Sequence, residues 1–467
     1  MAQMAQRSAG VLRRYRWTEL WLLILPFVLF LLAMTQLLLS NLDPTSSLKI
    51  NNLPIGQGLT PIVGLIAALL GFHVVMNIFF RKADQFLLPL VGVLTGLGVI
   101  MSTRLGPDIG IPGLGNRQLT WVFIGLVICL GTMFALRNIN WLARYKYTAA
   151  LFGVVMFCTT LVNTFKVKDL NSPTHDQLNI GPFNFQPSEL LKICIVIFFA
   201  AYLSENREIL AEGSLKFGPF RLPPLRQLGP ILMMLGIGLL LFLVVRELGL
   251  ALLIYGIFLC MIYLGTSKIS YVVTSALMAV VFGFIGYLLL GYVKQRFAVV
   301  GIDMVNWNAQ SDALYYEIGG GGQVVQGLIA IASGGILGAG LGLGHPAGKF
   351  FVPAVHTDMV LTAFAEELGL VGLFAIIGIY LLIVYRGFRI AMEASDPFQQ
   401  LLAAGLTSIF AIQTLIISAG NLKIMPLTGI PLPFMTYGGS SVFANFIIVG
   451  LLLLISHRSK VEREGDF

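Results

Sequence analysis

A charged pair stands inside one of the apolar stretches of this sequence. "QPSELLK" places Glu189 and Lys192 three residues apart at the start of the apolar run 188–203. In a helix this spacing puts both side chains on one face, where they can form an ion pair. Charged groups within a membrane are costly and usually mark a functional site. We therefore expect the two residues to pair and to line a central cavity, although a purely structural ion pair fits the same pattern.

A second polar group stands at the start of the apolar run 358–385. "HTDMVLTAFAEELG" brings His356, Asp358 and Glu366 to this position, with Glu367 beside them. Acids at the mouth of a membrane span are candidates for a functional site. Asp358 could instead cap the helix, a common role for aspartate, and one of the two glutamates could face water.

Arginines flank several connections that share one side of the predicted membrane. Arg104 and Arg117 border one loop between apolar runs, and Arg296 lies near the start of a longer connection. The guanidinium group grips phosphate oxygens in a planar, two-pronged geometry, so a cluster of arginines there suits a diphosphate. Anchoring to lipid headgroups explains any single one of them equally well.

The composition indicates what kind of scaffold must hold these groups. The chain has 467 residues, of which 57% are hydrophobic and 11% charged, whereas soluble proteins carry roughly 25% charged residues. Apolar runs of about 20 residues, the length that spans a bilayer, recur along the whole chain. They predict an all-α polytopic membrane protein with about 12 transmembrane helices, at 17–39, 60–80, 86–103, 119–136, 147–164, 188–203, 228–245, 248–264, 270–292, 358–385, 400–420 and 442–456.

The distribution of positive charge orients these helices. Lys and Arg are more numerous in the set of connections that includes both chain ends than in the opposite set. The positive-inside rule then places both termini in the cytoplasm. The net charge of +8 is thus a signal of membrane topology, and a nucleic-acid partner is excluded.

Two outer connections have an unusual composition. Segment 293–357 is the longest and is rich in glycine, and we expect it to carry short helices at the membrane surface. "PLTGIPLPFMTYGGSS", residues 426–441, contains Pro433 and ends in Ser440 and Ser441. Irregular backbone at membrane depth is tolerated only where protein buries it or where it lines a cavity. We therefore expect a re-entrant loop here, before the last helix.

Four stretches together resemble the SEDS family, the RodA/FtsW/SpoVE group. They are "FQPSELLK", "QVVQGLIAIASGGILGAGLGLG", "VHTDMVLTAFAEELGLVG" and "PLTGIPLPFMTYGGSS", in the family's order. The resemblance runs from about residue 85 to the C-terminus. It implies a catalytic membrane domain over 85–467, with its outer catalytic loop at about 293–357. Residues 1–84 would then form an N-terminal extension with two transmembrane helices.

The resemblance also implies an activity. SEDS proteins are glycosyltransferases that polymerise lipid II into β-1,4 glycan strands during elongation, division or sporulation. Lipid II and the glycan linked to undecaprenyl diphosphate would be the substrates, with Mg²⁺ or Mn²⁺ as a divalent cation. A class B penicillin-binding protein would be the partner, in the bacterial cytoplasmic membrane. Two alternatives stay open: a flippase or transporter of lipid-linked precursors, and a non-enzymatic scaffold of the wall-synthesis machinery.

The catalytic base implied by the resemblance is an acid upstream of Gln323, the glutamine that opens the Gly-rich helix. Asp303, Asp312 and Glu317 compete for this role. The family typically has an aromatic residue about five positions before its aspartate, and Trp307 stands five before Asp312. Counting back from Gln323 at the family's usual spacing favours Glu317. We rank Asp312 first, Glu317 second and Asp303 last; ordinary solvated loop charges are the alternative for all three.

Overall fold

The computed structural model covers most of the chain. It describes residues 15–40, 58–167, 178–180, 183–212, 215–217, 220–222, 229–230, 232–236, 247–316, 321–344, 352 and 354–465. Glu317 and most of the predicted span 228–245 lie outside the described residues.

Helices dominate the described part of the chain, which confirms the predicted all-α membrane class. Within it, nine helices are long and apolar enough to cross a membrane. They are α2 (Trp17–Ser40), α4 (Thr60–Phe79), α5 (Leu87–Asp108), α6 (Leu114–Ala135), α12 (Leu248–Thr266), α13 (Ile269–Leu289), α17 (Val360–Glu393), α18 (Pro397–Asn421) and α19 (Gly439–Gly465). Two further predicted spans, 147–164 and 188–203, coincide with α8 (Lys146–Val167) and α9 (Ser188–Glu205).

The remaining described elements are short. Five are helices: α7 (Asn140–Arg144), α10 (Arg207–Glu212), α14 (Gly291–Val300), α15 (Ala309–Tyr316) and α16 (Gly321–Gly334). Two antiparallel strand pairs, which the sequence reading did not anticipate, join β1 (Leu178–Ile180) to β2 (Phe183–Phe185) and β3 (Leu215–Phe217) to β4 (Phe220–Leu222). The helices α14 to α16 occupy the long connection 293–357, as predicted.

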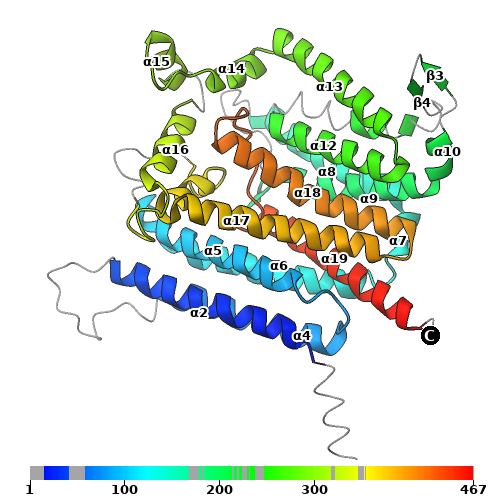
Figure 1. The fold of residues 1–467 in the computed structure, drawn as a ribbon, viewed down its shortest axis with the longest axis horizontal. Helices are drawn as coiled ribbons and strands as arrows, with labels where there is room; N and C mark the ends of the chain where they lie inside the picture. Colours follow the sequence, from blue (N-terminus) through cyan, green and yellow to red (C-terminus); the bar gives the residue numbers. More distant parts are fainter. Residues whose placement is uncertain are drawn as a thin grey trace, which may run out of the picture.

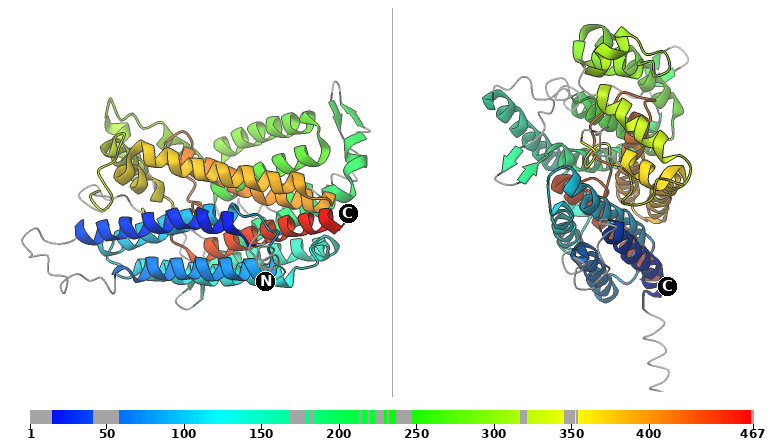
Figure 2. Two further views of the ribbon diagram at one scale, coloured as in Figure 1. Left: turned by 60° about the horizontal axis from the view of Figure 1, so that its bottom comes forward. Right: turned by 90° about the vertical axis from the view of Figure 1, so that its left-hand side faces the viewer.

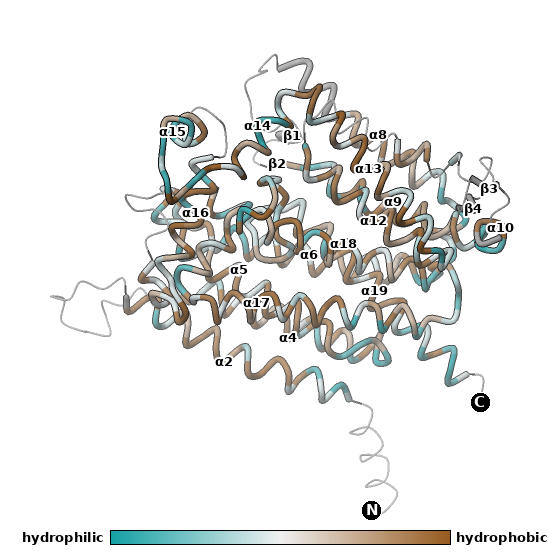
Figure 3. Tube along the Cα trace, turned by 45° about the horizontal axis from the view of Figure 1, so that its top comes forward, coloured by the Kyte–Doolittle hydropathy of each residue, from teal (hydrophilic) through white to brown (hydrophobic). Residues whose placement is uncertain are grey.

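The long helices form one bundle whose two ends differ. Lys82 Nζ lies 2.7 Å from Glu464 Oε2, so the start of α5 and the end of α19 meet at one end, which we call the terminal end. The helices α14 to α16 lie toward the opposite end, which we call the site end (Figure 1). The helix α2 lies at an edge of the bundle, packed on α4 and α5 (Figure 2). Hydrophilic residues gather at helix ends and in the short helices α10 and α15 (Figure 3).

Burial separates interior helices from peripheral ones. Most residues of α18 and α9 are buried. In α13, by contrast, Tyr271 is the one buried residue among those described. An apolar helix that exposes nearly all of its side chains suits contact with lipid, where apolar surface carries no hydration penalty.

Candidate active site

The signature loop, residues 426–441, runs through the interior at the centre of the site. Leu432, Phe434 and Thr436 within it are almost fully buried. Its carbonyl groups find partners on the surrounding helices: the Tyr380 hydroxyl donates to the Pro433 oxygen, and Gln118 Nε2 donates to the Thr436 oxygen over 3.2 Å. Irregular backbone with satisfied carbonyls is what burial at membrane depth requires, so the predicted re-entrant loop is confirmed.

The helix α5 approaches this loop closely at Gly98. A Cβ atom added there would lie 2.8 Å from both the Phe434 and the Met435 carbonyl oxygens. Such contacts with backbone are too short to be relieved by a rotamer change, so glycine is required.

We expect Gly98→Ala to displace the signature loop and to cost on the order of 1–3 kcal/mol of stability, as overpacking does. Gly131→Ala in α6 is the matched control, because a Cβ added at Gly131 meets nothing within 4 Å. The melting temperature in detergent and the rate of lipid II polymerisation are measured for both variants. Equal melting temperatures and equal rates in the two variants would contradict this account of the loop.

Asp358 lies where α16, α17 and the signature loop meet. Its Oδ1 accepts hydrogen bonds from Gln323 Nε2 at 3.1 Å and from Thr357 Oγ1 at 3.2 Å. A Cβ added at Gly429 would lie 4.0 Å from its Oδ2, so the loop runs alongside the carboxylate. The N-cap of α17 is Met359; Asp358 therefore does not cap the helix, and the capping alternative is wrong.

The electrostatics around Asp358 are those of a desolvated carboxylate. Burial raises the pKa of Asp358, and its hydrogen bonds and the Arg296 charge oppose this only in part. Arg296 also donates from Nη1 to the Leu427 oxygen at 2.8 Å, which ties α14 to the signature loop. His356 accepts a hydrogen bond at its carbonyl from Tyr437 N at 2.9 Å, and burial lowers the pKa of His356, which favours a neutral ring at pH 7.

We expect Asp358→Asn to stabilise the protein at neutral pH. The asparagine oxygen can still accept from Gln323 and Thr357, while the cost of burying a charge disappears. A carboxyl group whose pKa is raised by folding contributes stability below its unfolded pKa and loses it as pH rises through the folded pKa. The gain in melting temperature over wild type should therefore grow with rising pH and vanish toward pH of about 4. A gain that is independent of pH would contradict this assignment.

The predicted pair Glu189–Lys192 is present and buried. Lys192 Nζ lies 2.8 Å from Glu189 Oε2, and it also donates to Gln413 Oε1 at 2.9 Å. Gln413 Nε2 in turn donates to the Pro431 oxygen at 2.6 Å. The pair is therefore linked to the signature loop through one side chain of α18. Its lining of a cavity stays a prediction.

The two serines that end the signature loop serve as hydrogen-bond acceptors. Ser440 Oγ accepts from the Gln186 backbone nitrogen at 2.9 Å. Ser441 Oγ accepts from Asn445 Nδ2 at 3.2 Å. Both contacts position the start of α19 and the approach to α9.

Arg104 is engaged by the protein itself. Its Nε donates to Glu367 Oε1 at 3.1 Å and its Nη2 to the Gly344 oxygen at 2.8 Å, while Nη1 pairs with Asp108. The other Glu367 oxygen, Oε2, accepts from Gly342 N at 3.0 Å. These contacts hold the Gly-rich segment that follows α16 against α17. Diphosphate binding by Arg104 stays a prediction.

The neighbouring acids and Arg117 have contrasting surroundings. Glu366 and Glu367 are both buried, so the expectation that one of them faces water is wrong. Burial is imposed by the Gly-rich segment, whose Ala339 and Gly340 nitrogens bond the carbonyl oxygens of these two residues at 2.9 and 3.0 Å. Arg117, in contrast, is exposed in the first turn of α6.

The two described acids of the catalytic-loop hypothesis, Asp303 and Asp312, differ in their hydrogen bonds. Asp312, in the first turn of α15, is exposed and accepts one hydrogen bond from Trp307 Nε1 at 2.7 Å. Asp303 is exposed as well, but its Oδ1 accepts from Val305 N and Asn306 N, both at 2.9 Å, and these bonds lower its pKa. Glu317 lies outside the described residues. Of the two described acids, Asp312 therefore has the carboxylate that accepts fewer hydrogen bonds from the protein.

A small apolar cluster packs the connection that carries Asp303 and Asp312 against the signature loop. Val299, Ile302, Leu314, Val324 and Val325 pack together, and Leu427 of the signature loop packs against them. The connection that carries Asp303 and Asp312 therefore packs against the loop that runs alongside Asp358.

Comparison with known proteins identifies the family. The model of the FtsW, RodA and SpoVE cell cycle proteins matches residues 85–461. The chain belongs to this family. Similar relatives include the peptidoglycan glycosyltransferase RodA of Mycobacterium leprae, 34% identical over 399 residues, which are 83% of this chain and 81% of that protein. The probable peptidoglycan glycosyltransferase FtsW of Geobacter sulfurreducens is 30% identical over 345 residues, 74% of this chain and 86% of that protein.

Solved structures share the fold of this FtsW/RodA/SpoVE protein. One, titled "Structural coordination of polymerization and crosslinking by a peptidoglycan synthase complex", gives a TM-score of 0.62 at 24% identity, covering 81% of this chain and 98% of the other. The rod shape determining protein RodA of Thermus thermophilus gives a TM-score of 0.52 at 22% identity, covering 80% and 97%.

Several contacts of the site were not predicted from the sequence. Gln413 and Gly98 were not singled out, although a glutamine inside an apolar run signals a buried polar contact. Glu367 was named only as a neighbour of Glu366. Its pairing with Arg104 joins residues far apart in the chain, and no local pattern reports such a contact.

Proposed function

We propose that this protein is a peptidoglycan glycosyltransferase that polymerises lipid II into β-1,4-linked glycan. Its relatives, the peptidoglycan glycosyltransferase RodA and the probable peptidoglycan glycosyltransferase FtsW, support the class of enzyme. The observation that carries the assignment to this chain is the arrangement at the site end: α15, which bears an exposed Trp–Asp pair, packs on α16, and α16 supplies Gln323 to a buried polar group. That group consists of Asp358, Gln323 and Thr357, beside Arg296 and the signature loop.

In the proposed reaction, the 4-hydroxyl of one sugar attacks the anomeric carbon of another, which bears undecaprenyl diphosphate. The Asp312 carboxylate takes the hydroxyl proton as the new C–O bond forms. The bond from the anomeric carbon to the diphosphate oxygen breaks, and its electron pair leaves with the diphosphate. Inversion at the anomeric carbon gives the β link. Such chemistry needs a base for the hydroxyl and positive charge for the leaving group.

The roles of the neighbouring residues follow from their positions. Trp307 orients the Asp312 carboxylate through its Nε1 hydrogen bond and exposes 44% of its surface, so its ring can pack against a sugar. Arg296 would supply positive charge near the diphosphate, because it already lies at the junction of α14 and the signature loop.

A divalent cation, Mg²⁺ or Mn²⁺, would neutralise part of the diphosphate charge. Among the described residues, no group of three or more His, Cys, Asp or Glu side chains could hold a metal ion by itself. Magnesium is commonly bound by one or two carboxylates together with substrate phosphates. Asp312, whose carboxylate is exposed, fits that mode, with the substrate phosphates completing the coordination. Chelation by EDTA should stop the reaction, and added Mg²⁺ should restore it.

The proposed orientation places both termini in the cytoplasm and the site end at the outer face of the bacterial cytoplasmic membrane. The charge distribution along the sequence supports this. The first and last described segments lie together at the terminal end of the bundle, because Arg16 Nη1 donates to the Arg81 oxygen at 3.3 Å and Lys82 Nζ lies 2.7 Å from Glu464 Oε2. The membrane lipids and the lipid tail of the substrate would contact the exposed apolar faces.

The proposed partner is a class B penicillin-binding protein, a transpeptidase that cross-links the polymer. A structure with the same fold is titled as a peptidoglycan synthase complex that coordinates polymerisation and cross-linking. Co-purification of this chain with such a transpeptidase from the native membrane tests the partnership. A polymerase that is fully active alone would make the partner dispensable.

Polymerisation of purified lipid II tests the function. The full chain in detergent, with its partner and Mg²⁺ or Mn²⁺, should convert labelled lipid II into glycan that a muramidase degrades. Absence of polymer under these conditions, with folded protein present, would overturn the proposal. Transbilayer movement of lipid II without polymer would assign the flippase alternative instead.

A further inference from the structure

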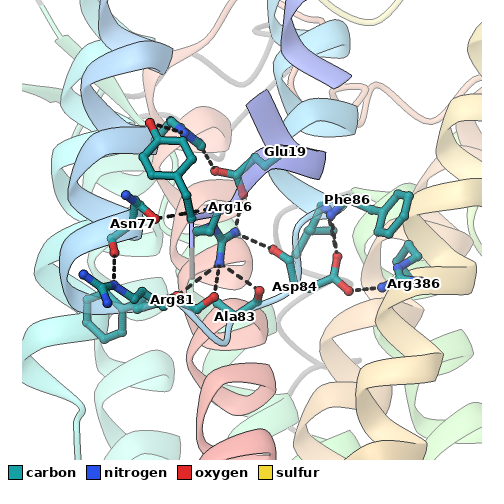
Figure 4. A network of polar contacts seen from close by, with 12 residues as sticks. Arg16, Glu19, Asn77, Arg81, Ala83, Asp84, Phe86 and Arg386 are labelled. Carbon is teal, nitrogen blue, oxygen red and sulfur yellow. Dashed lines mark hydrogen bonds and ion pairs between the residues drawn. The ribbon is translucent and has the colours of Figure 1, made fainter. Parts of the chain in front are cut away.

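The N-terminal extension is attached to the family domain by a buried polar network at the terminal end of the bundle. The family match begins at residue 85, so α2 and α4 lie outside it. Arg16, just before α2, is fully buried. Figure 4 shows its guanidinium pointing into the connection between α4 and α5, where several carbonyl oxygens converge on it.

Arg16 fixes the shape of that connection. Its Nη1 donates to the carbonyl oxygens of Phe80, Arg81 and Ala83 at 3.1, 3.3 and 2.8 Å. Its Nη2 donates to the Asp84 carbonyl oxygen at 2.9 Å and pairs with the Glu19 carboxylate. A single guanidinium thus contacts the carbonyl oxygens of four residues between positions 80 and 84, which no uncharged side chain can do.

The same connection carries a second charge contact, which reaches α17. Asp84 Oδ1 accepts from Phe86 N at 2.9 Å and from Leu87 N at 3.0 Å, so the carboxylate holds the two backbone amides at the start of α5. Its Oδ2 pairs with Arg386 of α17, whose guanidinium carbon lies 4.4 Å from the centre of the Phe86 ring. The position of Asp84, which Arg16 sets, therefore determines where α17 is held.

The helices α5 and α17 are consequently joined by ion pairs at both ends. Asp84 and Arg386 join them at the terminal end, and Arg104 and Glu367 join them at the site end. Between these pairs, α5 supports the signature loop at Gly98. Beyond the site-end pair, α17 begins at Val360, two residues after Asp358. A non-helical turn at Gly369 divides α17 between Glu367 and Arg386, so a shift of the part that carries Arg386 would reach Asp358 through that turn and the first residues of α17.

We propose that Arg16 is a positioning residue of the outer active site, acting through Asp84 and Arg386. The N-terminal extension then forms part of the catalytic unit, because it supplies the residue that fixes α17 on α5. The proposal rests on the proposed glycosyltransferase function for its kinetic readout, and the experiment below also includes a structural readout that does not depend on it.

The test compares substitutions in the full chain. Arg16→Gln and Arg386→Gln remove the two guanidinium groups of the network. Arg389→Gln is the matched control, because Arg389 lies on the same helix, is 48% exposed and pairs only with Glu393 among the acids described. Arg16→Lys keeps the charge and three donors, so it should retain part of the function lost in Arg16→Gln.

We expect Arg16→Gln and Arg386→Gln each to lower kcat for lipid II polymerisation about tenfold, with KM little changed, since misplaced groups cost rate rather than affinity. The double variant should be no slower than the slower single one, because both residues act through Asp84. Additive losses, or a kcat for Arg386→Gln equal to that of Arg389→Gln, would overturn the proposal. Should Arg16→Gln fail to accumulate, Arg16→Lys and Arg386→Gln decide the outcome by the same criteria.

Amide hydrogen exchange gives the second readout. Arg16→Gln should reduce protection of the Phe86 and Leu87 amides and of α17 around Arg386, while Arg389→Gln should not. Unchanged protection around Arg386 would overturn the proposal even if the enzyme is active. If wild-type protein shows no polymerisation, the proposed function fails, and the exchange measurement still tests the network.

Discussion

Replacing Asp312 with asparagine should reduce lipid II polymerisation about 100-fold or more, the loss typical of a missing general base. Asparagine retains the oxygen that accepts the Trp307 hydrogen bond, but it has no basic electron pair for the sugar proton. Because Asp312 is exposed, the free energy of unfolding should change by less than about 0.5 kcal/mol. Initial rates of polymer formation and thermal unfolding, measured on the same preparation, separate the two effects.

Asp303→Asn provides the matched control in the same connection. Asparagine can accept the hydrogen bonds that Asp303 Oδ1 receives from Val305 and Asn306, so the local turn should persist and activity should stay close to that of wild type. Full activity in Asp312→Asn would sink its assignment as the base. A loss in Glu317→Gln or Asp303→Asn instead would move the role to that acid.

Replacing Lys192 with methionine should destabilise the protein by about 3–5 kcal/mol, the cost of leaving a buried charge without its partner. Glu189 would lose the ammonium group that lies 2.8 Å away, and Gln413 would lose the donor that orients it toward the Pro431 carbonyl. The total activity of a preparation should fall in proportion to its content of folded protein. Melting temperature and the yield of monodisperse protein in detergent measure the effect.

The double variant Glu189→Gln with Lys192→Met separates charge from function. It removes both charges, so it should recover much of the lost stability. Its activity should stay low if the link through Gln413 positions the signature loop. Arg389→Met is the control for loss of an exposed ion pair and should cost less than about 1 kcal/mol. Wild-type activity in the stable double variant would leave the pair with a structural role alone.

Helix positions were largely predictable from the sequence because the apolar runs are long enough to span a bilayer on their own. The ion pair Glu189–Lys192 was predictable for a similar reason: its three-residue spacing fixes proximity within one helix. Broken backbone between two spans likewise predicted the buried signature loop. In each case, the physical constraint acts over a few residues.

Contacts between distant segments were not predictable in this way. Arg104 and Glu367 are 263 positions apart, and Arg386 and Asp84 are 302 apart. The expectation that one of Glu366 and Glu367 faces water failed because the Gly-rich segment folds back over both, supported by the non-helical turn of α17 at Gly369 (φ 68°, ψ −172°). Such packing depends on the tertiary arrangement, which helix length and residue spacing do not report.

The most direct test of the proposed function measures polymerisation and transbilayer movement in one system. Wild-type chain and Asp312→Asn, each with the partner transpeptidase, are reconstituted in vesicles that carry labelled lipid II and Mg²⁺. The proposed function predicts muramidase-sensitive polymer with wild-type protein and almost none with Asp312→Asn. Movement of lipid II across the bilayer without polymer in wild-type vesicles, unaffected by Asp312→Asn, would contradict it.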